Sequence, residues 1–487
     1  MTRFLDHEAR LYLAAHPFAY PLLRLLARLG PVVRVPRLGV VVNDAAVARR
    51  VLMDPAFRKD GPGSPGDLWT PVLGPSVLLN MEGEAHAALR AKLAPLFVPA
   101  TVRALVADVL AGPLDELEGR LARGETVDLV DTMRLMAGAV ICKVIGLGEV
   151  SEERARELFA DGERVVSMVS LRTRSLSARQ VKVAREVLDR IGDIASAAYR
   201  DGDPGTVMGR MSELGLSEAE ARGAAGAFFL TGTETVATFV PRLVALLHDH
   251  GAFGSGPGSG VEREEEPGER PGGGSGRWAG GEPGGPARGE PGDQAGGEPG
   301  DPAGGEPGDR AGGEPGDRAG GEAGDEARGR AGEGRGDRPG EGPRDAPGGR
   351  AGGEAGLVVD LDRAIEEAMR VTTPTPVMLR SVSRVARVGN VDVRPGDRVM
   401  IVTHNCARAA GGFDPSRRHP PELRRLWFGA GAHFCIGYPL AVEEIKAVAS
   451  VVLRTKVTVV RRRAARGVLL PTYAELLVRR VEPDGIC

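Results

Sequence analysis

The ten residues "FGAGAHFCIG", at positions 428–437, place one of the chain's four cysteines in a short, glycine-rich turn. Gly429, Gly431 and Gly437 permit backbone conformations that other residues adopt only under strain. A run of apolar residues with helical spacing begins directly afterwards. We therefore expect Cys435 to lie beside a helix N-terminus, where the backbone amides favour a thiolate.

Two kinds of chemistry suit such a thiolate. A nucleophile would need a neighbouring base, and His433 stands two residues before Cys435. A metal ligand would need a metal that takes one protein sulfur, because Cys142, Cys406 and Cys487 lie far away in the sequence and form no CxxC pair. A haem iron with a single axial thiolate meets this condition.

Residues 428–437 match the pattern F-x-x-G-x-x-x-C-x-G, and the chain thereby resembles the cytochrome P450 family of haem-thiolate monooxygenases. The resemblance implies that Cys435 is the axial ligand of the iron of haem b. It also places Phe428 and Gly437 in the cofactor-binding loop. Val442 departs from the pattern, since an arginine is common at this position. Three further stretches match the family in the expected order.

The first of these stretches is "EAMR", in which Glu367 and Arg370 are three residues apart on one face of an expected helix. The spacing alone fits an ordinary exposed ion pair, which contributes little to stability. In the family, the matching pair forms a charge network near the cysteine loop. The resemblance therefore implies that Glu367 and Arg370 have a structural role and not a catalytic one.

The second stretch is "LTGTETVA", residues 230–237, inside an apolar helical run. A carboxylate buried in such a run is costly unless it is used or satisfied. We expect the small Gly232 to let a ligand approach the helix backbone. The resemblance implies that Glu234 and Thr235 are the catalytic acid–alcohol pair that relays protons during oxygen activation.

The third stretch is "HAALR", in which His86 and Arg90 share one face of an expected helix. On its own, this spacing fits a solvated helix face equally well. The resemblance implies that both residues bind a haem propionate, together with Arg380 and His433. Arginine suits a carboxylate because its planar guanidinium can bind both oxygens.

Residues 251–356 differ from the rest of the chain. They hold 39 of the 70 glycines, and their 22 acidic and 12 basic residues give a net charge of -10. The unit "AGGEPGD" recurs with a period of eight residues. Because so few apolar residues cannot offset the entropy lost on ordering, we expect a disordered insert. It could screen a basic docking face, or be a neutral expansion of a surface loop.

Residues 1–250 and 357–487 are expected to form a single catalytic domain. The pattern predicts two short strands and a helix at 33–52, and helices through most of 84–249. Short strands are expected around 377–401, a helix after the cysteine loop, and strands at the end of the chain. The predicted fold class is mainly α with a minor, discontinuous β part, and the resemblance identifies it as the cytochrome P450 fold.

Composition excludes several classes of protein. The net charge of -3 argues against a nucleic-acid-binding protein. Few, scattered cysteines argue against a disulfide framework and favour the cytoplasm. Prolines and arginines interrupt the apolar stretch at 11–30, so it is not a membrane span. An amphipathic helix is favoured there, with peripheral membrane contact as the alternative.

The resemblance implies a monooxygenase that inserts one oxygen atom from O2 into a hydrophobic small molecule, by hydroxylation or epoxidation, in secondary metabolism. Its electron donors would be a ferredoxin and a ferredoxin reductase. Arginines before the cysteine loop could favour an acidic donor, namely Arg417, Arg418, Arg424 and Arg425. One alternative is a peroxide-dependent haem-thiolate enzyme, against which the intact acid–alcohol pair argues. The other is a non-catalytic haem-binding scaffold.

Overall fold

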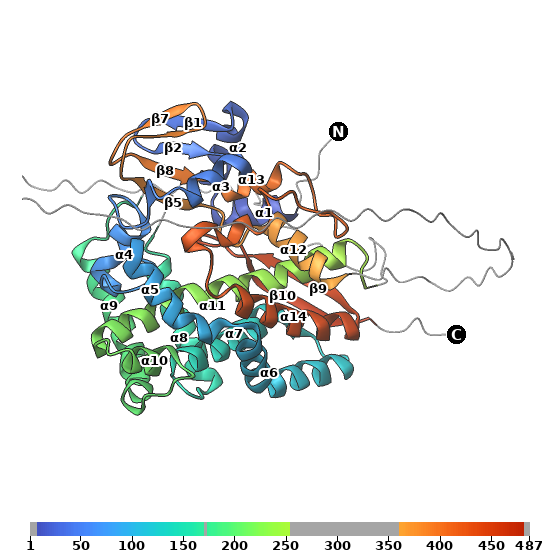
Figure 1. Cartoon of the computed structure of the whole chain (residues 1–487). Helices are drawn as coiled ribbons and strands as arrows, with labels where there is room; N and C mark the ends of the chain where they lie inside the picture. The colour runs from blue at the N-terminus through green and yellow to red at the C-terminus, as the bar shows by residue number, and fades with distance from the viewer. Residues whose placement is uncertain (1–6, 170–172, 254–359, 482–487) are drawn as a thin grey trace, which may run out of the picture. The chain divides into compact units, whose positions relative to one another are not determined.

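Helices account for most of the residues that the computed structural model describes, which are 7–169, 173–253 and 360–481 (Figure 1). The prediction of a mainly helical protein with a minor, discontinuous β part is confirmed. Most of the expected insert lies outside the described residues. Phe253, which lies near the start of the expected insert, is among the described residues and is buried in the main core.

Helices occur both before and after the cysteine loop along the chain. In chain order, the helices and 3₁₀ turns are α1 His7–Ala15, α2 Ala19–Leu29, α3 Ala45–Met53, α4 Pro65–Leu73, α5 Gly83–Leu93, η1 Ala94–Phe97, α6 Pro99–Ala122, α7 Leu129–Ile145, α8 Glu152–Val166, α9 Ala178–Asp201, α10 Val207–Glu213, α11 Glu218–Asp249, α12 Leu361–Thr372, α13 Thr403–Arg408, η2 Leu426–Phe428, η3 Gly431–His433 and α14 Tyr438–Thr455.

The strands form three small sheets. They are β1 Val32–Val35, β2 Gly39–Val42, β3 Phe57–Arg58, β4 Val127–Asp128, β5 Met378–Val382, β6 Ala386–Val388, β7 Val391–Val393, β8 Arg398–Ile401, β9 Val457–Ala464 and β10 Tyr473–Arg480. The largest sheet has the order β1-β2-β8-β5-β3, with β2 and β8 parallel and the other neighbours antiparallel. The others are β4-β10-β9 and β6-β7.

The five-stranded sheet is covered on both faces because its side chains alternate. Val40, Val42, Val399 and Ile401 pack in one cluster with residues of α3. Val41, Met400 and Val402 pack in another cluster with residues of α2. Figure 1 shows α2 and α3 beside this sheet. The register also sets Arg380 of β5 opposite Val399 of β8, which fixes the place of one predicted site residue.

The longest helix, α11, forms the centre of the helical part. Ser217 caps its start through a reciprocal pair of hydrogen bonds with Glu220, which satisfies two otherwise unpaired amides. The helix is buried along most of its length and packs against α7, α9 and α14. It therefore carries residues 230–237 into the interior of the protein.

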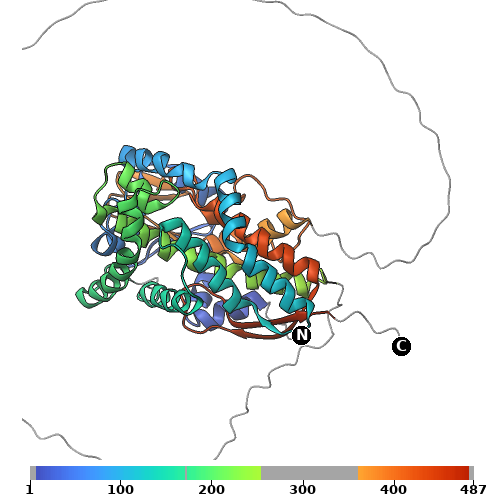
Figure 2. The same cartoon turned by 90° about the horizontal axis from the view of Figure 1, so that it is seen from below.

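The cysteine loop leads directly into α14, as the sequence predicted. This helix packs against α6 and α11, and α6 and α14 lie side by side in both views (Figure 2). Pro439 occupies its first turn, where the missing amide hydrogen costs nothing. The loop is thereby attached to a helix of the main hydrophobic core.

The apolar stretch at 11–30 is divided between α1 and α2 by a break between Ala15 and Ala19. Among the described residues, no single helix combines the length and apolar character that crossing a membrane requires. On length and composition alone, the bent pair Gly83–Phe97 and Pro99–Ala122 meets that requirement jointly.

Candidate active site

The cysteine loop is closed by its own backbone. The amide of Cys435 donates to the carbonyl of Phe428 at 2.9 Å, and the amide of Phe434 donates to the carbonyl of Gly431 at 3.1 Å. The rings of Phe428 and Tyr438 meet edge to face, with centroids 4.9 Å apart. These contacts hold the cysteine at a fixed position at the start of α14.

The glycines of this loop serve its folding in different ways. Gly429 and Gly431 have φ values of 85° and 65°, in the left-handed region that favours glycine. A Cβ on Gly431 would also lie 3.0 Å from the carbonyl oxygen of Leu52. Gly437 has an ordinary φ of -78°, so the expectation of a special backbone conformation there is wrong. Its missing side chain instead leaves space beside Cys435, whose Sγ lies 3.9 Å from the Cβ position.

The environment of Cys435 favours a metal ligand over a free nucleophile. Its side chain is exposed, yet protein atoms surround it so densely that burial raises the pKa of the thiol. Hydrogen bonds from the amides of Gly437 and Tyr438 act in the opposite direction but are outweighed. The amides at the helix terminus thus favour the thiolate, as the sequence predicted, but burial has the larger effect on the pKa. A metal ion bound to the sulfur would supply the missing positive charge.

His433 is paired with a carboxylate. Its Nε2 lies 2.9 Å from Oε2 of Glu82, and its ring centroid is 4.2 Å from that of His86. Burial lowers the pKa of His433, although Glu82 opposes this shift. Burial and then His433 lower the pKa of His86 to about 4. The two predicted histidines are thus brought together, and His433 has Glu82 for its partner.

Five basic side chains gather in the region of Cys435, namely Lys59, His86, Arg90, Arg380 and His433. Burial lowers the pKa of Arg90, and it lowers the pKa of Arg380 to about 10. Glu82 supplies opposing negative charge from the protein. Buried cations are costly unless they are paired, so the cluster suits a ligand with carboxylate groups. The residues present therefore fit the propionates of haem as well as its iron.

Lys59 is a member of this cluster that the sequence did not reveal. It follows β3, and its carbonyl accepts a hydrogen bond from the amide of Gly66 at 2.7 Å. Its amide donates to the carboxylate of Glu82. Burial, reinforced by Arg380, lowers the pKa of Lys59 to about 7. No local pattern marks the residue, because the contacts that define its role come from distant segments.

The acid–alcohol pair lies in the middle of α11. Glu234 is buried, and burial followed by repulsion from Glu163 raises its pKa to about 7, while Arg134 opposes the shift. Arg134 and Glu163 form an ion pair of 2.7 Å. The Thr235 hydroxyl donates to the carbonyl of Thr231 at 3.2 Å. Thr231 is exposed, between the buried Leu230 and the half-buried Gly232, so this part of the helix borders accessible space.

The expectation that Gly232 lets a ligand approach the helix is wrong. A Cβ on Gly232 would lie 2.5 Å from Cδ1 of Ile141, so this glycine permits close packing of α11 on α7 and not the approach of a ligand.

Glu367 and Arg370 form the centre of a buried network, so the interpretation as an exposed ion pair is wrong. Two hydrogen bonds of 2.7 and 2.8 Å join them, and both side chains are fully buried. Glu367 also accepts from Arg417 at 3.1 Å and contacts Nε2 of His419 at 2.8 Å. Burial alone would raise the pKa of Glu367, but Arg370 and then His419 outweigh it and lower the pKa to about 2. Arg370 further donates to the carbonyl of Ala407 at 2.7 Å.

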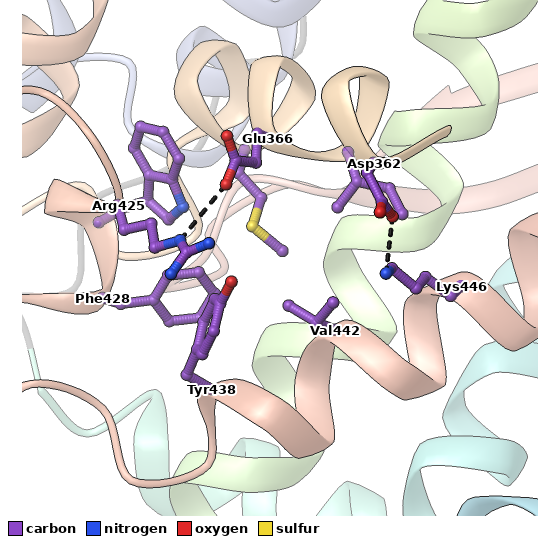
Figure 3. A pocket seen from close by; sticks show the side chains of 10 residues that line it. Asp362, Glu366, Arg425, Phe428, Tyr438, Val442 and Lys446 are labelled. Atoms are coloured by element: carbon purple, nitrogen blue, oxygen red, sulfur yellow. Dashed lines mark hydrogen bonds and ion pairs between the residues drawn. The ribbon is translucent and has the colours of Figure 1, made fainter. Parts of the chain in front are cut away.

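A pocket of about 130 Å³ lies between α12, the segment before the cysteine loop, and α14 (Figure 3). Figure 3 shows Arg425 between Glu366, at 3.3 Å, and the ring of Tyr438, whose centroid is 4.7 Å from the guanidinium carbon. Lys446 binds Asp362 at 2.6 Å. These pairs fix α12 and α14 on either side of the loop. The pocket is also lined by the short side chain of Val442, at the position where the family pattern has an arginine.

Sequence comparison finds a family profile and relatives that match parts of this chain. The family profile described as "Cytochrome P450" matches residues 360–461. The cytochrome P450 YjiB of Bacillus subtilis (strain 168) is 36% identical over 86 residues, which are 17% of this chain and 21% of that protein. The cytochrome P-450 monooxygenase DoxA of Streptomyces peucetius subsp. caesius is 34% identical over 120 residues, 24% of this chain and 27% of that protein. The matched segments thus span between a fifth and about a quarter of these relatives.

Structural comparison extends the likeness to nearly the whole chain. A mutant of P450 EryK in complex with erythromycin B superposes with a TM-score of 0.63 at 17% sequence identity, over 98% of this chain and 99% of that one. At this identity, the superposition establishes the fold alone. The cysteine loop, the buried Glu367–Arg370 network and α11 therefore lie on a scaffold whose fold is similar to that of this structure.

Proposed function

We propose that the chain is a member of the cytochrome P450 family and a monooxygenase that inserts one atom of O2 into a hydrophobic small molecule, by hydroxylation or epoxidation. The observation that carries this proposal is the accessible thiol of Cys435, held in a closed loop beside a cluster of buried and half-buried basic side chains. Haem b, when bound, supplies the redox chemistry of oxygen activation, and the protein supplies binding, orientation and protons.

The residues present suggest how the group is held. Cys435 would supply the sulfur ligand of the iron, the Phe428 carbonyl closes the loop by accepting from the Cys435 amide, and the missing side chain of Gly437 leaves space beside the sulfur. The carboxylates of the group would bind the basic side chains of this cluster, which are His86, Arg90, Arg380, His433 and, as an addition from the structure, Lys59. Burial lowers the pKa of Lys59, Arg90 and Arg380, and bound carboxylates would stabilise the charged forms of these side chains.

Lys59→Met is expected to lower the affinity for haem roughly tenfold, because a hydrogen bond between charged groups contributes about 1.5–3 kcal/mol. The measurement is a titration of the haem-free protein with haem, followed by its absorption. Lys92→Met, at an exposed position of α5, is the matched control and should bind as the wild type does. Equal affinities for the two variants would exclude Lys59 from the haem site.

The role of α11 is to hold and transfer protons. With its pKa at about 7, the Glu234 carboxyl carries a proton in a large fraction of molecules at neutral pH. The neighbouring hydroxyl of Thr235 can both donate and accept a hydrogen bond. We assign Glu234 as the proton donor and Thr235 as the group that passes the proton onward.

The substrate class is a hydrophobic small molecule of secondary metabolism. The side of α11 that borders accessible space offers Phe228 and the Thr231 hydroxyl, which suits a largely apolar ligand with few polar groups.

We propose a ferredoxin and a ferredoxin reductase as electron donors. Of the four arginines before the cysteine loop, Arg417 pairs with Glu367 and Arg425 with Glu366. Arg418 and Arg424 are exposed and are therefore the better candidates for contact with an acidic donor. The free cysteines Cys142 and Cys406 suit the reducing cytoplasm, where we place the protein.

The test of this function is the carbon monoxide difference spectrum of the reduced protein. A thiolate-ligated haem gives a strongly red-shifted Soret band, and we expect this band in the wild type. In Cys435→Ala it should disappear, because no other sulfur replaces the ligand. Cys142→Ala is the matched control, since Cys142 is buried elsewhere in the core. An unshifted band in folded, haem-loaded wild-type protein would refute the proposal.

A further inference from the structure

Helix α2 presents a stripe of exposed apolar side chains. Phe18, Leu22, Leu25 and Leu29 are 87%, 46%, 52% and 63% exposed, respectively. Their spacing of four, three and four residues places them on one side of the helix. Of the seven large apolar side chains that are exposed in the described structure, these are four. Such concentration on one short helix distinguishes the stripe from scattered surface leucines.

The helix is held in place by its opposite side. Tyr20, Leu23 and Leu26 are buried, and the two leucines pack against Val41 and Met400 of the five-stranded sheet. The stripe is therefore not needed for the attachment of α2 to the domain. The stripe lies on the side of α2 that faces away from the sheet. It is roughly 16 Å long from Phe18 to Leu29, at 1.5 Å per residue.

The segment that contains the stripe contributes charges of one sign. Residues 9–43 contain five arginines and no aspartate or glutamate. Arg24 and Arg28 are exposed on α2 itself, and the helical spacing places Arg28 one turn from Leu25. Arg34 is paired with Asp397 at 3.2 Å, and Arg10 and Arg37 lie outside α2, so Arg24 and Arg28 are the two cations of the helix. An apolar stripe flanked by cations is complementary to a partner surface that has an anionic outer layer over an apolar interior.

We propose that α2 docks on a bilayer that contains anionic lipid. The four apolar side chains enter the boundary between headgroups and acyl chains, and Arg24 and Arg28 bind the lipid phosphates. A second copy of this chain is a poorer occupant, because a two-fold contact would bring the same arginines face to face. The proposal concerns where the protein resides and does not depend on its catalytic activity.

The test is flotation of the full-length, haem-loaded protein with vesicles of phosphatidylcholine, with and without phosphatidylglycerol. We expect binding to the anionic vesicles that weakens in high salt. Leu22→Gln with Leu25→Gln, and separately Arg24→Gln with Arg28→Gln, should each lower the bound-to-free ratio at least on the order of tenfold. Val385→Gln removes an apolar side chain that is 75% exposed elsewhere and should bind like the wild type. Thermal unfolding verifies that each variant is folded.

Three results would overturn the proposal. One is failure of the folded wild type to float with anionic vesicles, and another is equal binding by the leucine variant. The third is self-association of the wild type that the leucine variant abolishes, in the absence of vesicle binding, since this would assign the stripe to a second copy.

Discussion

Glu367→Gln lowers the free energy of unfolding by about 3–5 kcal/mol, the range expected when one partner of a buried ion pair is removed. The substitution keeps the shape of the side chain but leaves the fully buried Arg370 without its countercharge. Arg417 and His419 lose the same partner. The effect is large because all of these groups sit between α12 and the segment that leads into the cysteine loop.

Denaturant unfolding, followed by the fluorescence of Trp427, measures this effect. The indole is buried and meets the ring of His419 edge to face at 5.6 Å, so it reports on the network directly. Asp362→Asn is the matched control on the same helix. Its pair with Lys446 is partly exposed, so we expect a cost below about 1 kcal/mol. Equal unfolding midpoints for the two variants would contradict the structural role.

The contribution of Glu367 to the stability of the folded protein decreases as the pH falls. The pKa of Glu367 is lowered to about 2 in the folded protein, so its contribution to stability is fully present above the pKa of the unfolded chain. That contribution is lost as the pH falls, between about pH 5 and pH 2. The difference in unfolding free energy between wild type and Glu367→Gln should therefore shrink over this interval.

The sequence predicted the parts of the site that depend on local spacing. The pattern around Cys435 predicted a turn before a helix, and the spacing of Glu367 and Arg370 predicted a pair on one helical face, as found. Apolar periodicity predicted the helices from 84 to 249 because each buries one continuous side. These features need no knowledge of which distant segments come together.

The parts that were missed depend on tertiary contacts. Lys59 and Glu82 join the site through backbone and ion-pair contacts with segments that the sequence does not link to them. The role of Gly232 depends on Ile141, ninety-one positions earlier in the chain. The sign of the shift at Cys435 depends on how densely the surrounding protein excludes water. Burial of this kind follows from the packing of the whole domain and leaves no local signature.

Glu234→Gln is expected to lower the rate of product formation by about 10²–10⁴-fold, the usual contribution of a general acid. Glutamine keeps the size and hydrogen-bonding capacity of the side chain but holds no transferable proton. Thr235→Ala should keep its haem and consume electrons without matching product, releasing peroxide instead. Thr233→Val is the matched control, because the Thr233 hydroxyl is committed to the carbonyl of Phe229 at 2.9 Å. Its turnover should stay close to that of the wild type.

The pH profile separates proton donation from a structural role of Glu234. With the pKa raised to about 7 by burial and by Glu163, wild-type turnover should fall as the pH rises through this value, since the donor loses its proton. Glu163→Gln removes a repulsion and leaves Arg134 unopposed, so the falling limb should move to lower pH. In Glu234→Gln the slow residual rate should show no such limb. A limb at the same pH in all three proteins would assign the titration to another group and remove Glu234 from the proton path.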